Sequence, residues 1–147
     1  MKRDEFLTTF GIGLAAVCTG CLASCGKGDD PAPTPGPGIV TPPPTNANTT
    51  LNLSTDIRNV GDSKVLNGII IVRLAATDVP ASFTAVQVAC THQGTSVIFN
   101  TSQGNFVCPN HGSIFSTAGV VQPGFDAKTN LKVYNIAISG TTMTIKG

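Results

Sequence analysis

The sequence predicts that residues 51–147 form an all-β domain of antiparallel strands. Val, Ile and Thr make up almost a third of this stretch, and these β-branched residues favour pleated over helical packing. Glu is absent from it, and no useful length of it repeats apolar residues at the helical period. Short apolar runs recur instead between turn residues, which is the spacing typical of a small antiparallel β domain.

The apolar runs give the expected strands in chain order. They lie at residues 68–76, 83–89, 97–99, 106–107, 131–138 and 142–145. Ser139-Gly140 separates the last two runs and predicts a hairpin turn. The charged residues of the domain are scattered singly, which predicts that they lie on a solvated surface; they include Arg58, Lys64, Arg73 and Asp78.

Length and charge limit the classes of function. The chain has 147 residues and a net charge of +1, with 9 Lys and Arg against 8 Asp and Glu. This length suits one domain with additional segments. The even charge balance excludes the basic surface of a nucleic-acid binder, so no nucleic-acid partner is expected. The single Glu of the chain, Glu5, excludes a glycosidase that works with paired Glu residues.

Residues 1–24 have the composition of an export signal. Lys2 and Arg3 precede a mostly apolar run that ends in Leu22-Ala23-Ser24-Cys25. This tetrapeptide resembles the lipobox of bacterial lipoproteins, which implies a cleaved signal peptide and a lipid on Cys25. It places the protein outside the cytoplasm, anchored to a bacterial membrane and facing the periplasm or the cell exterior. Two alternatives are an uncleaved transmembrane helix and, for the export route, a twin-arginine signal with Asp4 replacing one Arg.

The segment between Cys25 and the β domain is predicted to be a disordered tether. Seven of the ten Pro residues lie between residues 26 and 50, among Gly, Thr and Asn, and the segment has almost nothing apolar to bury. In a polyproline conformation it could reach at most ~80 Å. The predicted organisation is therefore a signal peptide at 1–24, a lipidated and tethered segment at 25–50, and one domain at 51–147.

Two Cys and two His remain in the predicted domain, in two short motifs. These are Cys90-x-His92 and Cys108-x-x-His111, and they contain the only His residues of the chain. Two thiolates and two imidazoles can bind one tetrahedral zinc ion. A Cys90–Cys108 disulfide would also suit an exported protein, but it leaves both His unexplained. A [2Fe-2S] cluster with Cys on one iron and His on the other needs one Cys and one His from each of two loops, which this pattern supplies.

The two motifs, separated by the 15 residues 93–107, resemble those of the Rieske iron–sulfur family, and the resemblance covers roughly residues 52–147. It implies a Rieske-type domain of stacked antiparallel sheets with two cluster-binding loops. It also implies a Rieske-type [2Fe-2S] cofactor, with Cys90, His92, Cys108 and His111 as its ligands. Around them the resemblance includes Gly94 and Gly112, which allow tight turns, Pro109, which stiffens its loop, and Ser113, which donates a hydrogen bond to a bridging sulfide.

The resemblance implies one-electron transfer, coupled to a proton through the His ligands. The protein would be an electron carrier or an iron–sulfur subunit of an oxidoreductase rather than a stand-alone catalyst, and its partner a redox protein or a membrane quinol-linked complex. Two alternatives remain: a subunit of a larger quinol- or arsenite-oxidising complex, and a cluster-free surface binding module stabilised by zinc or a disulfide.

Several positions depart from the quinol-oxidising members of the family. Those members carry two further Cys, joined in a disulfide, where this chain has Thr95 and Asn110. They tend to have an apolar Leu at the position of Gln93, and often a Tyr at the position of Phe115 that donates to a cysteine sulfur. Because Phe115 cannot donate a hydrogen bond, the sequence predicts a reduction potential below that of the quinol-oxidising members.

Overall fold

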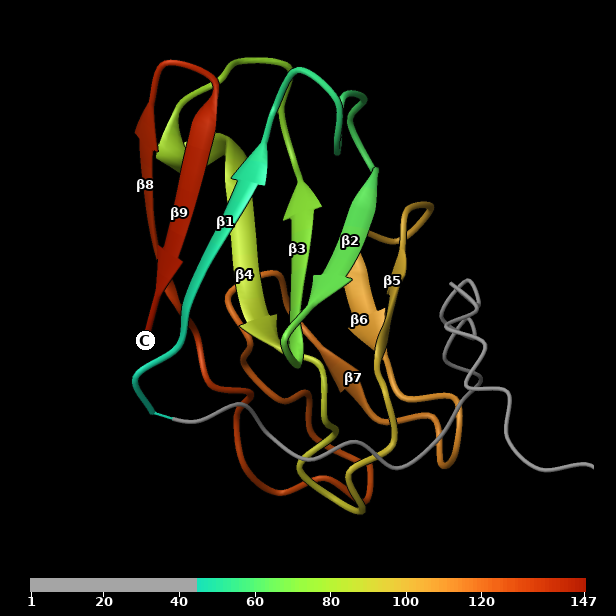
Figure 1. Ribbon diagram of the computed structural model, residues 1–147. Helices are drawn as coiled ribbons and strands as arrows, with labels where there is room; N and C mark the ends of the chain where they lie inside the picture. Colours follow the sequence, from blue (N-terminus) through green and yellow to red (C-terminus); the bar gives the residue numbers. More distant parts are fainter. Residues whose placement is uncertain (1–44) are drawn as a thin grey trace, which may run out of the picture. The chain divides into compact units, whose positions relative to one another are not determined.

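The computed structural model describes residues 45–147. Within them the chain forms three antiparallel sheets of three strands each (Figure 1). The first has the order β1 (Asn48–Asn52), β9 (Thr142–Lys146) and β8 (Asn135–Ser139); the second has β2 (Ser63–Leu66), β3 (Ile69–Arg73) and β4 (Phe83–Gln87); the third has β5 (Ile98–Asn100), β6 (Asn105–Val107) and β7 (Ile114–Phe115). One turn of 3-10 helix, η1 (Pro80–Ser82), precedes β4.

The second sheet lies between two apolar cores. All five residues of β3 are buried, and the first four alternate between the two cores, because successive side chains of a strand point to opposite faces of the sheet. Ile69 and Ile71 pack with Met143 and Ile145 of the first sheet. Ile70 and Val72 pack in the second core, which includes Phe106 and Phe115 of the third sheet. The sheets are therefore stacked in three layers, which confirms the predicted all-β fold class.

The first two strands were not among those predicted. β1 begins at Asn48, within the stretch assigned to the tether from its composition. Only Thr49 and Leu51 of β1 are buried, and the residues beside them are exposed. Such a short strand, with a polar Thr at one of its two inward positions, gives almost no apolar signal. β2 is equally weak, because each of its residues is exposed or only half-buried. The strand β7, which has only two residues, was not among the predicted strands either.

Two turns and one connection complete the comparison of predicted and observed strands. Ser139-Gly140 does turn the last hairpin, with Gly140 at φ 58°. Asn67 and Gly68, at φ 49° and 76°, make the turn between β2 and β3. The predicted strand at 131–138 begins only at Asn135. Its first half joins the second sheet through isolated hydrogen bonds, such as that from the Tyr134 N–H to the Ala85 carbonyl at 2.9 Å.

Arg73 corrects the expectation that the single charges lie on a solvated surface. Its side chain is only 4% exposed, and it lies 4.7 Å from the centre of the Phe83 ring. The guanidinium donates to the Ile57 carbonyl at 2.9 Å and forms an ion pair with Asp78 at 2.5 Å. Arg73 ends the fully buried strand β3, so its donors are satisfied by loop carbonyls and the Asp78 carboxylate rather than by water.

Residues 1–24, Cys25 and most of the predicted tether lie outside the described residues. Within the described part of the chain, no helix has the length and apolar character needed to cross a bilayer.

Candidate metal centre

Two loops carry the four predicted ligands, and both have the same backbone form. Residues 90–95 follow β4, and residues 108–113 connect β6 to β7. In each loop the Cys N–H donates to the carbonyl five residues later, and the N–H four residues later donates back to the Cys carbonyl, all at 2.8–2.9 Å. That fourth residue is Gly94 in one loop and Gly112 in the other, at φ 73° and 71°. A side chain at either position would be strained, which explains both glycines.

The two cysteines form the buried side of the site. Cys90 and Cys108 are free thiols, 3% and 2% exposed, and both pack in the second core. Burial raises the pKa of the Cys90 thiol, and a hydrogen bond with the Cys108 thiol raises it further. The backbone N–H groups of His92 and Gln93 donate to the Cys90 sulfur and lower the pKa. N–H donors of this kind stabilise a thiolate that is bound to a metal.

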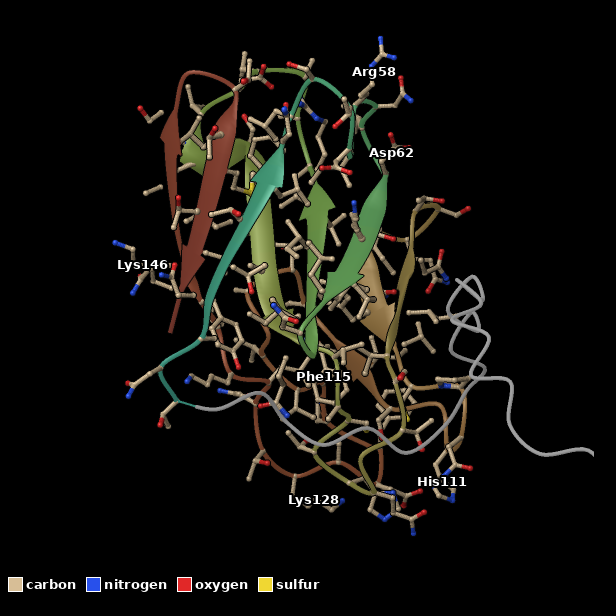
Figure 2. The ribbon with its side chains drawn as sticks, in the orientation of Figure 1. Arg58, Asp62, His111, Phe115, Lys128 and Lys146 are labelled. Carbon is tan, nitrogen blue, oxygen red and sulfur yellow. The ribbon has the colours of Figure 1, made fainter. Side chains whose placement is uncertain are left out.

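The two histidines form the exposed side of the site. His92 and His111 are both exposed, and His111 lies at the end of the domain opposite Arg58 and Asp62 (Figure 2). The Nδ1 atoms of the two rings face each other at 3.1 Å, and the ring centres are 4.7 Å apart. Two nitrogens bound to one tetrahedral metal ion lie roughly 3.3 Å apart, given metal–nitrogen bonds of about 2.0–2.1 Å. The imidazoles are thus placed to share one metal ion.

The sulfur pair and the nitrogen pair are separate. Among the described residues, the group that brings three potential ligand atoms within 4.8 Å of one another contains both His but neither Cys. A single tetrahedral zinc ion would hold all four ligand atoms within roughly 3.3–3.8 Å of one another. Two buried sulfurs beside two exposed nitrogens fit instead a two-metal cluster with Cys on one iron and His on the other.

Ser113 and Pro109 lie in the second loop, close in sequence to the predicted ligands His111 and Cys108. Ser113 is fully buried, and its Oγ accepts a hydrogen bond from the Ala127 N–H at 3.1 Å. Because the oxygen is the acceptor in this contact, the hydroxyl proton is left to donate elsewhere. Pro109 is exposed beside the buried Cys108. The hydrogen bond from Ser113 to a sulfide stays a prediction.

Three contacts at this end of the domain were not predicted. The Asn110 side chain donates to the Gln93 Oε1 at 3.2 Å, joining the two loops. Thr91 Oγ1 donates to the Thr129 carbonyl at 2.8 Å. Asp126 has a carboxylate oxygen within 4.8 Å of a ring nitrogen of each His. The sequence signal for Asp126 was weak, since it is one of several single charges and is marked only by following the Pro123-Gly124 turn.

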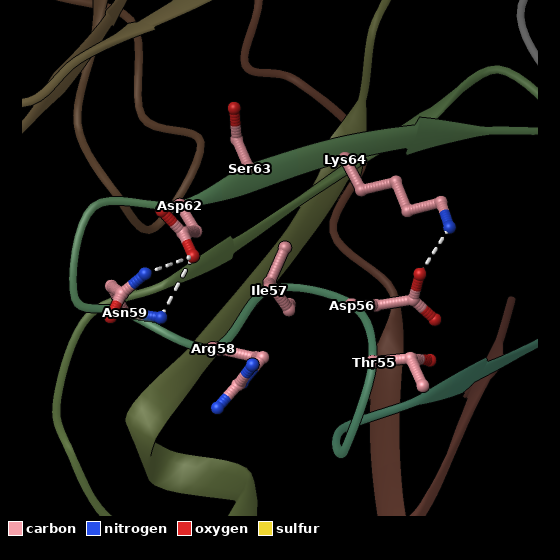
Figure 3. Close-up of a pocket in the computed structure, with 8 residues that line it drawn as sticks. All are labelled: Thr55, Asp56, Ile57, Arg58, Asn59, Asp62, Ser63 and Lys64. Atoms are coloured by element: carbon pink, nitrogen blue, oxygen red, sulfur yellow. Dashed lines mark hydrogen bonds and ion pairs between the residues drawn. The ribbon is translucent and has the colours of Figure 1, made fainter.

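A hollow of about 320 Å³ lies in the loop between β1 and β2 and is not part of this site (Figure 3). Both of its carboxylates already have partners. Lys64 pairs with Asp56 and is the main cause of the lowered pKa of that carboxyl. The backbone N–H of Asn59 donates to Asp62 at 2.8 Å and lowers the pKa of Asp62. These carboxylates order the loop rather than hold a ligand.

Stacked antiparallel sheets with one Cys and one His on each of two adjoining loops define a class of iron–sulfur protein whose [2Fe-2S] cluster has mixed Cys and His ligands. A model of the Rieske [2Fe-2S] domain matches residues 54–135, and the chain belongs to the Rieske family. The cofactor of this family is the Rieske-type [2Fe-2S] cluster, and its domains transfer electrons. The family assignment predicted from the Cys and His motifs is confirmed.

Two solved structures are similar to the chain. The plasma membrane Rieske protein PetC3 of the cyanobacterium Synechocystis PCC 6803 is 32% identical, with 54% of this chain and 76% of that chain covered and a TM-score of 0.46. The ferredoxin of carbazole 1,9a-dioxygenase from Nocardioides aromaticivorans IC177 is 17% identical, with 69% and 97% covered and a TM-score of 0.50. The second shows the same fold. No curated protein sequence matches the chain significantly.

Proposed function

We propose that the chain is a membrane-anchored one-electron carrier in which Cys90 and Cys108 hold one iron of the cluster and His92 and His111 hold the other. The observation that carries this proposal is the separation of the site into a buried sulfur pair and an exposed nitrogen pair with Nδ1 atoms 3.1 Å apart. When bound, the cluster supplies a reversible one-electron couple. Neutral imidazoles in place of two thiolates raise its potential above that of all-Cys clusters.

The buried and the exposed residues of the site have different roles. The second core keeps water from Cys90 and Cys108, and the N–H groups of His92 and Gln93 stabilise the Cys90 thiolate. His92 and His111 lie at the surface, where an electron can enter or leave without crossing the domain. Their exposed rings can exchange a proton at Nε2 with water, which supports the proton coupling that the family resemblance implies.

The partner we propose is a redox protein rather than a quinol. Quinol-oxidising members of the family tend to present an apolar residue at the position of Gln93. Here Gln93 and Asn110 are exposed amides that hydrogen bond to each other, and each is adjacent to one of the two His in the sequence. A polar surface of this kind suits a wet, transient contact between proteins.

The proposed anchoring through a lipid on Cys25 is supported by the lipobox-like sequence alone. A role as a subunit of a larger oxidoreductase is the second candidate function.

The proposal is tested by the spectrum of the purified protein from iron-replete cells. We expect visible absorption in the oxidised state and, after reduction, the EPR signal of a [2Fe-2S] cluster with mixed Cys and His ligands. His111→Ala should abolish both, while Thr91→Ala, which removes a hydrogen bond to the Thr129 carbonyl but no ligand, should keep them. A colourless protein containing one zinc ion, or a Cys90–Cys108 disulfide without iron, would contradict the proposal.

A further inference from the structure

We infer that the carboxylate of Asp126 lowers the reduction potential of the cluster by placing a negative charge beside both of its histidine ligands. The inference rests on the proposed ligand assignment and goes beyond it, since it gives a function to a residue outside the two loops. The carboxylate is within 4.8 Å of a ring nitrogen of each His. No other carboxylate of the described residues is grouped with these rings.

The position of Asp126 is fixed by its neighbours in the chain. The N–H of Ala127, which is 3% exposed, donates to the Oγ of the fully buried Ser113 in the second loop. Two residues further on, the Thr129 carbonyl accepts from Thr91 in the first loop. Asp126 therefore belongs to a third segment that is attached to both loops, and its backbone cannot move away from the ligands without breaking these two hydrogen bonds.

The negative charge of Asp126 is not neutralised by an ion pair. Among the described residues the salt bridges are those of Lys64 with Asp56 and of Arg73 with Asp78. Lys128, the nearest cation in sequence, donates to the Phe125 carbonyl at 2.6 Å. Adding an electron to the cluster makes it more negative, and an adjacent unpaired carboxylate opposes this change. The carboxylate therefore stabilises the oxidised state relative to the reduced state.

The test is a redox titration of three full-length variants loaded with the cluster. For Asp126→Asn we expect an equilibrium constant for reduction about tenfold higher, which corresponds to a rise in midpoint potential of about 59 mV for one electron. Asp126→Glu keeps the charge and should stay near the wild-type value. Asp62→Asn removes the same charge at the opposite end of the domain (Figure 2) and should leave the potential unchanged.

The salt dependence of the midpoint potential distinguishes a charge effect of Asp126 from a purely structural role. Because Asp126 is exposed, counterions screen it, so the difference between wild type and Asp126→Asn should shrink as salt is raised. An Asp126→Asn protein with a normal EPR signal and an unchanged potential would overturn this inference and leave the proposed function intact. A wild-type protein that shows no EPR signal of the cluster would instead overturn the proposed function.

Discussion

Phe115 occupies a position at which many quinol-oxidising Rieske proteins have a Tyr that donates to a cysteine sulfur. Here the side chain is fully buried, in the same core cluster as Cys90 and Cys108. A phenyl ring keeps water away from the sulfurs but donates nothing to them. The reduced, more negative cluster therefore lacks one hydrogen bond that would stabilise it.

Phe115→Tyr should raise the midpoint potential by restoring this donor. We expect a rise on the order of 60 mV, which is a tenfold change in the equilibrium constant for one-electron reduction. Redox titration followed by visible absorption measures it. Phe115→Leu is the matched control, because it changes the side chain without adding a donor and should leave the potential close to the wild-type value. A Tyr variant that titrates like the Leu variant would show that the hydroxyl does not reach a sulfur.

Tyr134 is a second residue at which one atom determines the expected effect. Its ring is buried, and its hydroxyl is buried without a hydrogen-bond partner. Tyr134→Phe removes this unsatisfied group and keeps the ring, including its contact with Lys132 at 4.8 Å. We expect the free energy of unfolding to rise by about 1 kcal/mol. Thermal unfolding should show an increase in Tm of roughly 4–8 °C for a domain of this size, whereas a decrease would reveal a partner for the hydroxyl.

The same residue gives a dependence of stability on alkaline pH. Burial raises the pKa of Tyr134, so the folded state favours the neutral phenol. Its contribution is fully present below the unfolded-state pKa of about 10 and is lost as the pH rises through that value toward the higher folded-state pKa. Wild-type stability should therefore fall more steeply than that of Tyr134→Phe above pH 10. Parallel curves for the two proteins would contradict the raised pKa.

At the scale of single residues, the sequence predicted what depends on short spacing and missed what depends on distant contacts. The Cys and His pairs lie two and three residues apart, so the motif alone marks them. Asp126 approaches His92 only because the segment that follows the Pro123-Gly124 turn returns to the first loop, and no local pattern encodes that return. Arg73 was misjudged for the same reason, since its partners include Ile57, sixteen residues away.

The two loops are the elements on which cluster retention depends. They lack the disulfide that joins the corresponding loops of quinol-oxidising relatives, and the Gln93–Asn110 amide pair at 3.2 Å links them instead. An exposed hydrogen bond is weaker than a covalent bond and contributes about 1 kcal/mol. The loops should therefore open more readily than disulfide-linked loops, and the amide pair should limit how often they do.

Asn110→Ala should speed loss of the cluster about fivefold, as expected when about 1 kcal/mol is removed from the closed state. The measurement is the decay of visible absorption in the presence of an iron chelator. Gln93→Ala should have the same effect, and the double variant should add little to either single change, because both remove the same contact. Fully additive effects would show that the two amides act independently.

At the scale of elements, the strands with a strong local apolar signal were predicted, and the strands that depend on pairing with distant strands were not. The runs that became β3 and β4 were predicted because both faces of these strands are buried and mostly apolar, and a mostly apolar run is visible in any register. β1 and β2 bury little or only alternate residues, so their existence depends on pairing with β9 and β3. Such pairing is a property of the assembled sheets and leaves little trace in the local sequence.

At the scale of the whole molecule, the net charge of +1 gives little long-range attraction to a partner. We propose that anchoring at the membrane, rather than charge attraction, brings the domain close to its partner. A lipid on Cys25 and a Pro-rich tether that ends where β1 begins, and so reaches at most ~70 Å, would confine the domain to a thin layer at the membrane. Confinement of this kind raises the effective concentration of a domain near a membrane-held partner by orders of magnitude without any new contact.

Cys25→Ala should abolish lipid attachment while leaving the cluster unchanged. In cells fed a labelled fatty acid, the wild-type protein and the control Cys18→Ala should carry the label, and Cys25→Ala should carry none. Any Cys25→Ala protein released from the membrane should show an unchanged EPR signal and an unchanged rate of reduction by dithionite in solution. Its electron transfer to a membrane-held partner should fall about 100-fold or more, because the effective concentration supplied by the tether is lost. A label that persists on Cys25→Ala would place the lipid elsewhere, and an unchanged rate of transfer would show that recognition does not depend on the anchor.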